Sequence, residues 1–579
     1  MANWQKTIAI DVSALPQDEP FFEKLVPLFR ERVEERSGAK VTETADYTLS
    51  FRLNKALAAE AFEIRTTDAG AEISGADFNA LVFGMGRFLH SSRYDAQGME
   101  PSAWRGVSVP KSDLRGVYFA MHFFNWYQQC RADELERYVE DLMLWGVNAI
   151  FVIFPRISLS SWDDPETERV LGNLRKTFAA AKKMNMKTGF QSSNQDFCEP
   201  DPRYAADKSL LGVKAGNLIC PGTEGGYQHL KGIITRVLRE LKPIGVDYMS
   251  FFSFDEGGCS CKNCWPWASR GLYNYAKRMS REIREELLPD VKIILATWYF
   301  GRGENNGGDW DGFYERVRKD EEAGDDWLDA ILIETRDHPA CQYILEHGRP
   351  SERIRTVTFP DICMMGLEPW GGWGAVIAPH QVCEEQLRYK DVADGCYMYS
   401  EGKYDDLHKA VCAQLFWDYG KDPMDTVAEY IGYEYPGTDV QKGVELIRLV
   451  EDNHRLTNKF SKKPADMEKA KRALEICEEM DRAIYAPLKQ SWRWRIVYAR
   501  VHLDWYRYSG AEKEGWPYER YLQSHRNDFW ADFTEGNAEA EAYLLELIHI
   551  YHAMEVNTPG KYYLHASVRP PLRNDREGG

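Results

Sequence analysis

The chain has 579 residues, which is too long for a single ordinary hydrophobic core. Hydrophobic residues make up 44% and charged residues 28%, a composition that excludes intrinsic disorder. Its formal net charge of −18 argues against nucleic acid or an anionic membrane as the main partner. The sequence has no run of eighteen apolar residues, so we expect no membrane span. It does not begin with a basic segment followed by an apolar run, so we expect no signal peptide. We therefore expect a cytoplasmic protein whose twelve scattered cysteines are mostly reduced.

Residues 1–110 are predicted to form a small α/β domain. Thr7–Val12 has the pattern of a strand. Ala61–Thr66 and Ala71–Ser74 predict a hairpin, because the Asp-Ala-Gly between them is a turn sequence. Phe78–His90 has the apolar periodicity of a helix.

A regular alternation of strand and helix patterns fills residues 111–437. Eight strands alternating with helices over this length predict a (β/α)8 TIM barrel rather than an open doubly wound sheet. The open sheet is further disfavoured because no glycine-rich phosphate loop follows the first strand. The predicted strands are Leu114–Met121, Asn148–Phe154, Lys187–Gln191, Tyr248–Phe254, Lys292–Tyr299, Ala330–Glu334, Arg355–Phe359 and Gly395–Ser400.

Residues 438–579 are predicted to form an α-helical C-terminal domain. Glu445–Leu456 and Glu541–Tyr551 have heptad-like apolar spacing, which is typical of packed helices. A homodimer through this domain is the oligomer that we expect if the chain associates.

Polar and aromatic side chains gather where the predicted barrel strands end. Reactive residues of a barrel lie at the carboxyl ends of its strands. Glycoside cleavage needs an acid for the leaving oxygen and a second group for the oxocarbenium-like centre, and carboxyl groups can supply both. The strand-end residues that we assign to such a site are His122, Arg156, Asn194, Asp255, Glu256, Trp298, Arg302, Glu334, Asp361 and Glu401.

The adjacent carboxylates Asp255 and Glu256 are the sharpest feature of this set. Like charges held close raise the pKa of at least one group, which suits a general acid. The following Gly257-Gly258 lets the backbone turn tightly. A solvated acidic loop is the ordinary alternative. We assign catalysis to Glu256, with Asp255 beside it.

Cys259, Cys261 and Cys264 form a C-x-C-x2-C cluster directly after this pair. Three soft ligands so close together can bind zinc, with Cys198 or Cys220 as a fourth ligand. Three reduced thiols in a tight loop are the alternative. Hydrolysis itself requires no cofactor, and a closed thiolate site has no open position, so a zinc ion here would be structural.

Trp370 and Trp373 lie in a glycine-rich loop after the seventh predicted strand. Indole rings in such a loop suit the apolar faces of sugars, and they serve equally well as loop anchors. Arg156, Arg302 and Arg336 at three strand ends suit an anionic sugar such as a uronic acid, because guanidinium groups bind carboxylates as forks. They could equally balance the acidic cluster.

Several motifs resemble glycoside hydrolases of families 20 (β-N-acetylhexosaminidases), 67 (α-glucuronidases) and 163. Leu81–Leu89 resembles part of the small α/β domain that precedes the barrel in families 20 and 67. Leu114-Arg115-Gly116-Val117 resembles the first barrel strand of family 20, in which the arginine that matches Arg115 grips hydroxyls of the terminal sugar. The helical C-terminal region resembles families 67 and 163, so the likeness covers nearly the whole chain at the level of a clan.

The Asp255-Glu256 pair is similar to the Asp-Glu pair of the hexosaminidases. In that family the aspartate orients the acetamido group of the substrate and the glutamate is the general acid. Glu401 resembles the eighth-strand glutamate of the family, which binds sugar hydroxyls. The family motif has a histidine and two glycines before the pair, whereas phenylalanine and serine stand there within Phe251–Phe254. N-acetyl specificity and the role of Asp255 therefore stay open.

These features predict an exo-acting glycoside hydrolase that cleaves small imported oligosaccharides or glycosides, with hexosaminidase-like or uronidase-like specificity. Either the acetamido group of the substrate is the nucleophile, or Glu334, Asp361 or Glu401 serves as nucleophile or base. Two other hypotheses are a carbohydrate-binding barrel without catalysis and a zinc-dependent hydrolase built on the cysteine cluster.

Overall fold

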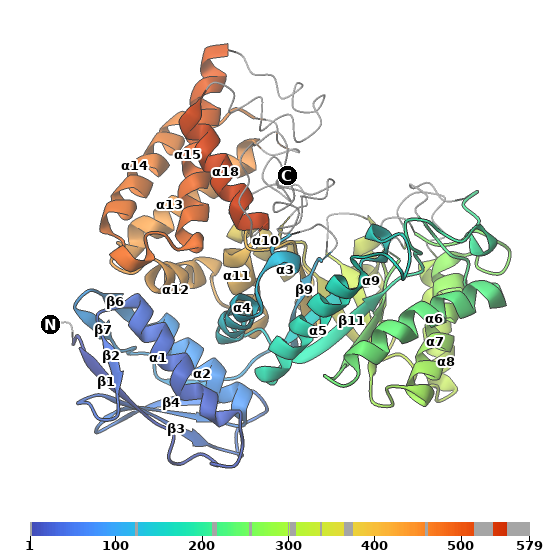
Figure 1. Ribbon diagram of the computed structural model, residues 1–579, viewed down its shortest axis with the longest axis horizontal. Helices are drawn as coiled ribbons and strands as arrows, with labels where there is room; N and C mark the ends of the chain where they lie inside the picture. Colours follow the sequence, from blue (N-terminus) through green and yellow to red (C-terminus); the bar gives the residue numbers. More distant parts are fainter. Residues whose placement is uncertain are drawn as a thin grey trace.

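The chain is arranged as its sequence predicts, with a small N-terminal α/β domain, a closed barrel of parallel strands and a helical C-terminal region (Figure 1). The closed barrel excludes the open doubly wound sheet. None of the helices in the described ranges has the length and apolar character that crossing a membrane requires. The computed structural model describes residues 3–121, 125–210, 217–253, 257–298, 300, 309–335, 339–363, 375–457, 461, 463–514 and 537–552.

The N-terminal domain is built on a six-stranded sheet in the order β2-β1-β3-β5-β4-β8. The predicted hairpin is confirmed, because β4 and β5 pair antiparallel and Gly70, with a φ of 147°, begins β5 at the turn. The sheet strands and the two helices of the domain are β1 (Thr7–Asp11), β2 (Lys40–Thr42), β3 (Thr48–Leu53), β4 (Phe62–Thr67), β5 (Gly70–Gly75), β8 (Gly106–Ser108), α1 (Leu25–Arg36) and α2 (Phe78–His90).

Helix α2 packs on β5 and, on its other side, on helix α4 of the barrel. Gly86 permits this close approach, since a Cβ atom there would lie 2.0 Å from the carbonyl oxygen of Leu144. A short antiparallel pair, β6 (Arg93–Asp95) and β7 (Gly98–Glu100), follows α2. The N-terminal domain is therefore in tight contact with the barrel.

Eight strands close the barrel, and every neighbouring pair is parallel. Strands β9, β10, β12 and β13 are shorter than predicted. Beyond Phe251 and Ala296, the apolar runs continue as the core aromatics Phe252 and Trp298 instead of extending the ladder. The strands are β9 (Leu114–Phe119), β10 (Ala149–Ile153), β11 (Lys187–Ser192), β12 (Tyr248–Phe251), β13 (Lys292–Ala296), β14 (Ala330–Glu334), β15 (Arg355–Phe359) and β16 (Gly395–Ser400).

Aromatic side chains fill the interior of the barrel. Phe151 stacks on Tyr397 with ring centroids 4.1 Å apart. Toward the carboxyl ends of the strands, Phe252, Trp298 and Phe359 contact one another at centroid distances of 5.3 to 5.9 Å. This packed core leaves the rim above it as the place for a ligand.

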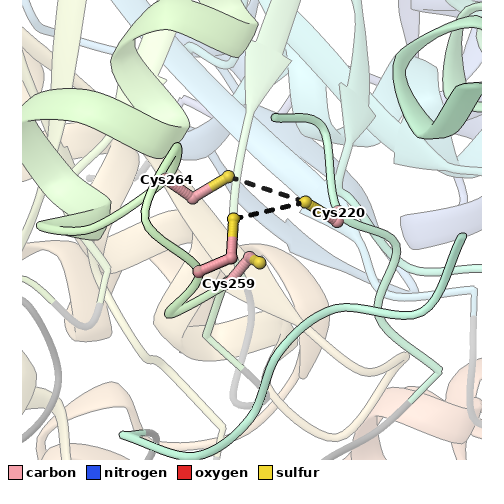
Figure 2. A group of neighbouring side chains, drawn as sticks. Cys220, Cys259 and Cys264 are labelled. Atoms are coloured by element: carbon pink, nitrogen blue, oxygen red, sulfur yellow. Dashed lines mark hydrogen bonds between the residues drawn. The ribbon is translucent and has the colours of Figure 1, made fainter. Parts of the chain in front are cut away.

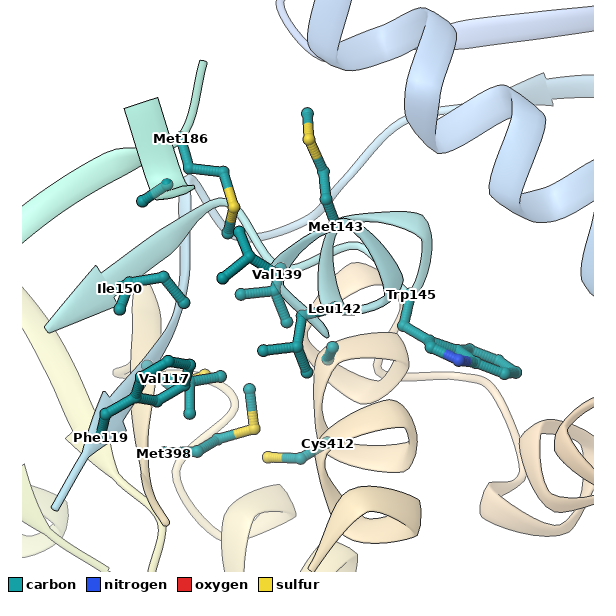
Figure 3. Close-up of a cluster of buried hydrophobic side chains, with 14 of the residues drawn as sticks. Val117, Phe119, Val139, Leu142, Met143, Trp145, Ile150, Met186, Met398 and Cys412 are labelled. Atoms are coloured by element: carbon teal, nitrogen blue, oxygen red, sulfur yellow. The ribbon is translucent and has the colours of Figure 1, made fainter. Parts of the chain in front are cut away.

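The outer face of the barrel strands is covered by helices. Figure 3 shows Val117 and Phe119 of β9 and Ile150 of β10 facing Val139 and Leu142 of α4. The odd-numbered residues of β9 therefore point outward, since side chains alternate along a strand. The helices around the barrel are α3 (Trp126–Gln129), α4 (Ala132–Leu144), α5 (Thr167–Lys183), α6 (Glu224–Leu241), α7 (Tyr273–Glu286), α8 (Trp310–Glu322), α9 (Pro339–His347), α10 (Pro379–Leu387) and α11 (Asp406–Trp417).

The C-terminal helices reach the carboxyl rim of the barrel. Leu503 and Leu547 are buried in one cluster with Ala375 and Tyr404, of which Tyr404 follows β16. This region thus borders the candidate site. Its helices are α12 (Pro423–Glu434), α13 (Val440–Thr457), α14 (Met467–Ala483), α15 (Trp492–Glu514) and α18 (Ala538–His552).

Candidate functional site

Three carboxylates stand at the carboxyl ends of the consecutive strands β14, β15 and β16. Glu334 is the last residue of β14, Asp361 pairs with Tyr399 in an isolated bridge, and Glu401 directly follows β16. Because side chains alternate along a strand, each carboxylate shares the inward face with the barrel-core residues before it. The rim therefore holds a set of inward-facing acids.

Two of these carboxylates are withdrawn from water. Glu401 is 2% exposed and its Oε1 accepts a 2.6 Å hydrogen bond from the hydroxyl of Tyr399. Burial and the charge of Glu401 raise the pKa of Tyr399 well above its usual value, so the phenol remains a donor. Glu334 is 5% exposed, whereas Asp361 is half-buried and accepts from the backbone N–H of Cys363 at 3.4 Å.

The turn that carries Glu401 is fixed by a buried polar network. Lys409 and Asp405 form a fully buried ion pair, and Ser400 Oγ donates to Asp405 Oδ1 at 3.1 Å. The hydroxyl of Tyr127 lies 2.6 Å from Ser400 Oγ. Burial raises the pKa of Asp405 to about 6. Sequence reasoning missed this network, because it depends on which polar residues the fold buries together.

Asn194 lies 1% exposed at the exit of β11. Its Nδ2 donates to the carbonyl of Ile219 at 3.2 Å, while its Oδ1 is buried and has no hydrogen-bond partner among the described residues. An unpaired buried acceptor is costly, so a ligand hydroxyl is a suitable partner for Asn194.

Deeper in the barrel, the hydroxyl of Tyr397 lies 3.0 Å from Ser250 Oγ and donates to Gln191 Oε1 at 3.3 Å.

The floor and one edge of the site are aromatic. Trp298 is 8% exposed and packs on Phe252, so it contributes to the floor rather than to an open platform. Beside the exit of β16 lies a pocket of about 230 Å³, whose lining includes Trp126, Lys403 and His549 of α18. Lys403 Nζ lies 4.3 Å from the ring centroid of Trp126, and burial lowers the pKa of Lys403 to about 8.

Arg156 holds the loop after β11. It begins a short 3-10 turn after β10 and is 3% exposed. Its Nε donates to the carbonyl of Gln195 and its Nη2 to the carbonyl of Ser193 at 2.6 Å. Burial lowers its pKa to about 10. The structure therefore shows Arg156 bracing the loop after β11 with Nε and Nη2, and its predicted contact with an anionic sugar stays a prediction.

Arg115 lies at the amino end of β9, at the end of the barrel opposite the rim, and points outward. Its Nε donates to the carbonyl of Gly146 and its Nη2 to Glu60 Oε2, both at 2.7 Å. The guanidinium also lies over the ring of Trp417, with its Cζ atom 4.8 Å from the ring centroid. The expected contact with sugar hydroxyls is wrong, because this fully buried arginine joins the barrel to the N-terminal domain.

Several predicted site residues lie outside the described residues, and their roles stay predictions. Described residues on both sides of the Asp255-Glu256 pair are well anchored. Trp267 Nε1 donates to Ser253 Oγ at 2.8 Å, and Gly257 has a φ of 75°, in agreement with the predicted tight turn. The residues outside the described ranges are His122, Asp255, Glu256, Arg302, Arg336, Trp370 and Trp373.

The cysteine cluster gains a fourth member in the fold. Cys220, from the loop after β11, joins Cys259, Cys261 and Cys264, and the four Sγ atoms all lie within 4.8 Å of one another. Figure 2 shows the sulfur atoms of Cys220, Cys259 and Cys264 facing one another. Cys198, the other candidate, is exposed and lies outside this group.

Comparison with known proteins places the chain by its fold. No protein-family model matches the sequence. A search of curated proteins also gives no match. Solved structures do match: the chain is similar to CpGH89 from Clostridium perfringens, solved with its substrate GlcNAc-α-1,4-galactose, at a TM-score of 0.60 and 14% identity over 91% of this chain and 65% of that chain.

Two further solved structures match at lower TM-scores. A Streptomyces plicatus β-hexosaminidase in complex with GlcNAc gives a TM-score of 0.49 at 11% identity, over 74% of this chain and 91% of that chain. A GH138 enzyme targeting pectin rhamnogalacturonan II gives a TM-score of 0.46 at 10% identity, over 94% of this chain and 93% of that chain. The likeness to CpGH89, which has the TM-score above 0.5 among these three, confirms at the level of the fold the resemblance to a clan of glycoside hydrolases.

Proposed function

We propose that this chain is an exo-acting glycoside hydrolase whose active site is the carboxyl rim of the barrel. The observation that carries the proposal is the set of inward carboxylates Glu334, Asp361 and Glu401 above an aromatic floor. Glycoside cleavage needs paired carboxyl groups, one as acid and one as nucleophile, base or stabiliser. The reaction consumes water and requires no cofactor.

Each rim residue has a proposed role. Glu256 is the general acid, and Asp255 orients the substrate beside it. Glu334 is our first candidate for the second carboxylate, because it is inward-facing and nearly excluded from water, where its charge acts more strongly. Glu401, held by the hydroxyl of Tyr399, binds sugar hydroxyls.

The substrate class that we propose is a small glycoside with a terminal N-acetylhexosamine or uronic acid. N-acetylhexosaminides come first, since CpGH89, which has a similar fold, was solved with GlcNAc-α-1,4-galactose. Uronides come second, because Arg156 spends Nε and Nη2 on backbone carbonyls. The buried Oδ1 of Asn194 would accept a hydrogen bond from a substrate hydroxyl.

A screen of aryl glycosides, covering N-acetylhexosaminides and uronides of both anomers, tests the proposal. On the best substrate, Glu256→Gln and Glu334→Gln should each lower kcat, whereas Glu199→Gln, an exposed carboxylate in the loop after β11, should not. If Glu334 is the nucleophile, azide should restore turnover to Glu334→Ala and yield a glycosyl azide. Sugar binding without turnover in the wild-type chain would instead identify a carbohydrate-binding barrel.

A further inference from the structure

Four cysteines from two separate loops converge beside the rim of the barrel. Cys220 lies near the end of the loop between β11 and α6, and Cys259, Cys261 and Cys264 lie in the loop after β12. Cys220, Cys259 and Cys264 are buried and Cys261 is half-buried. The cluster is therefore largely enclosed, and its members come from the loops that follow two neighbouring strands of the barrel.

The sulfur distances match a tetrahedral metal site. Cys220 Sγ lies 3.7 Å from Cys261 Sγ and 3.9 Å from Cys264 Sγ. A tetrahedral zinc ion with Zn–S bonds of about 2.3 Å holds its sulfur ligands about 3.8 Å apart. A disulfide needs an S–S distance of about 2.05 Å, and all four cysteines are free.

The backbone around the cluster is shaped for close approach. A Cβ atom at Gly222 would lie 2.6 Å from Cys264 Sγ, so the cluster leaves no room for a side chain there. Asn263 Nδ2 donates to the carbonyl of Gly222 at 3.0 Å, which joins the two loops next to the sulfurs. Residues 257–266 form neither helix nor strand. A metal ion that crosslinks the cysteines within them would therefore hold this loop in one conformation.

We propose that Cys220, Cys259, Cys261 and Cys264 bind one structural Zn²⁺ ion that ties the loop after β11 to the loop after β12. Four protein ligands complete the tetrahedron and leave no open position for water or substrate, which argues against a zinc-dependent hydrolase. In the sequence, the first of the three loop cysteines follows Glu256 by three residues. The ion would therefore stiffen the loop that carries the proposed general acid.

Metal analysis of the full chain tests this site. Protein purified under reducing conditions without chelator should contain close to one zinc per chain. Metal-free protein titrated with Co²⁺ should develop the visible and near-ultraviolet bands of tetrahedral cobalt thiolate, and stoichiometric Zn²⁺ should abolish them. Protein that binds neither ion stoichiometrically, or that contains one iron per chain instead, would overturn the proposal, since a tetrahedral set of four thiolates also suits iron.

Two matched serine variants locate the site. Cys261→Ser removes the half-buried ligand and should reduce zinc content and abolish the cobalt thiolate spectrum of four-sulfur ligation. Cys198→Ser changes an exposed cysteine of the same loop region as Cys220 and should leave both unchanged. If Cys261→Ser does not fold, the cobalt titration of the wild-type chain decides. These readouts are independent of glycosidase activity, so the failure of either proposal leaves the other standing.

Discussion

The hydroxyl of Tyr399 donates a 2.6 Å hydrogen bond to Oε1 of Glu401, two residues further along the exit of β16. The Tyr399 ring also contacts the barrel core, with centroid distances of 5.9 Å to Tyr118 and 5.8 Å to Phe359. The orientation of the Glu401 carboxylate is therefore set by the packed interior of the barrel.

Tyr399→Phe should consequently weaken sugar binding at the rim. Loss of a hydrogen bond to a charged group costs about 1.5–3 kcal/mol, which corresponds to roughly 10- to 100-fold in kcat/KM. The thermal midpoint should change little, because the ring remains. Tyr343→Phe removes a phenol–carboxylate contact with Asp311 outside the barrel and serves as control. Full activity in Tyr399→Phe would show that Glu401 does not bind the sugar.

Glu256→Gln should reveal the general acid through the leaving group. The variant keeps the shape of the side chain and removes its proton, so turnover should fall by about 10²- to 10⁴-fold for poor leaving groups. The loss should be smallest for dinitrophenolate, which departs without protonation. An equal loss for all leaving groups, measured as kcat/KM across an aryl series, would transfer the role to another rim carboxylate.

Arg115→Ala should affect stability rather than catalysis. The fully buried guanidinium bonds Glu60 and the carbonyls of Ser112 and Gly146, and each lost hydrogen bond to a charged group costs about 1.5–3 kcal/mol. Urea unfolding should therefore shift strongly, while KM for the best substrate should stay near the wild-type value. Arg355 offers the matched control, since its ion pair with Asp113 at the amino end of β15 is exposed and Arg355→Ala should cost less than about 1 kcal/mol. A raised KM with unchanged stability would restore the expected sugar contact.

The barrel could be predicted from sequence because its eight apolar segments and their spacing are local signals. The rim position of Glu334 and Glu401 followed, since Glu334 ends a predicted strand, Glu401 directly follows one, and side chains alternate along a strand. The C-x-C-x2-C spacing likewise marked the cysteine loop. Local patterns were sufficient wherever strand order and alternation alone decide the position of a side chain.

Partners from distant segments could not be predicted. Cys220 and Cys198 were equivalent in sequence, and only the path of the loop after β11 brings Cys220 to the cluster. Nε and Nη2 of Arg156 donate to carbonyls at the exit of another strand. Arg115 was assigned by resemblance, although its place as the second residue of β9 puts it at the amino end of the barrel.

His408 of α11 bonds Ile362 and Ala378, which lie on either side of residues 364–374 in the sequence. Its Nδ1 lies 2.8 Å from the carbonyl of Ile362, and its Nε2 accepts from the backbone N–H of Ala378 at 2.8 Å. This pattern requires a neutral ring with the proton on Nδ1. Burial lowers the pKa of His408 to about 4, from 6.5.

The fold should therefore lose stability in acid through His408. Above pH 6.5 the ring is neutral in the folded and unfolded states and contributes no pH dependence. As the pH falls from about 6.5 to about 4, the unfolded chain takes up a proton that the folded chain excludes, so the free energy of unfolding falls by up to about 3 kcal/mol. Urea unfolding at pH 7 and at pH 4.5 measures this loss. His408→Gln cannot take up the proton, so it should lose less stability over this interval than the wild-type chain, whereas His347→Gln, an exposed control, should follow the wild type. Equal losses in all three proteins would show that His408 is not the group that titrates.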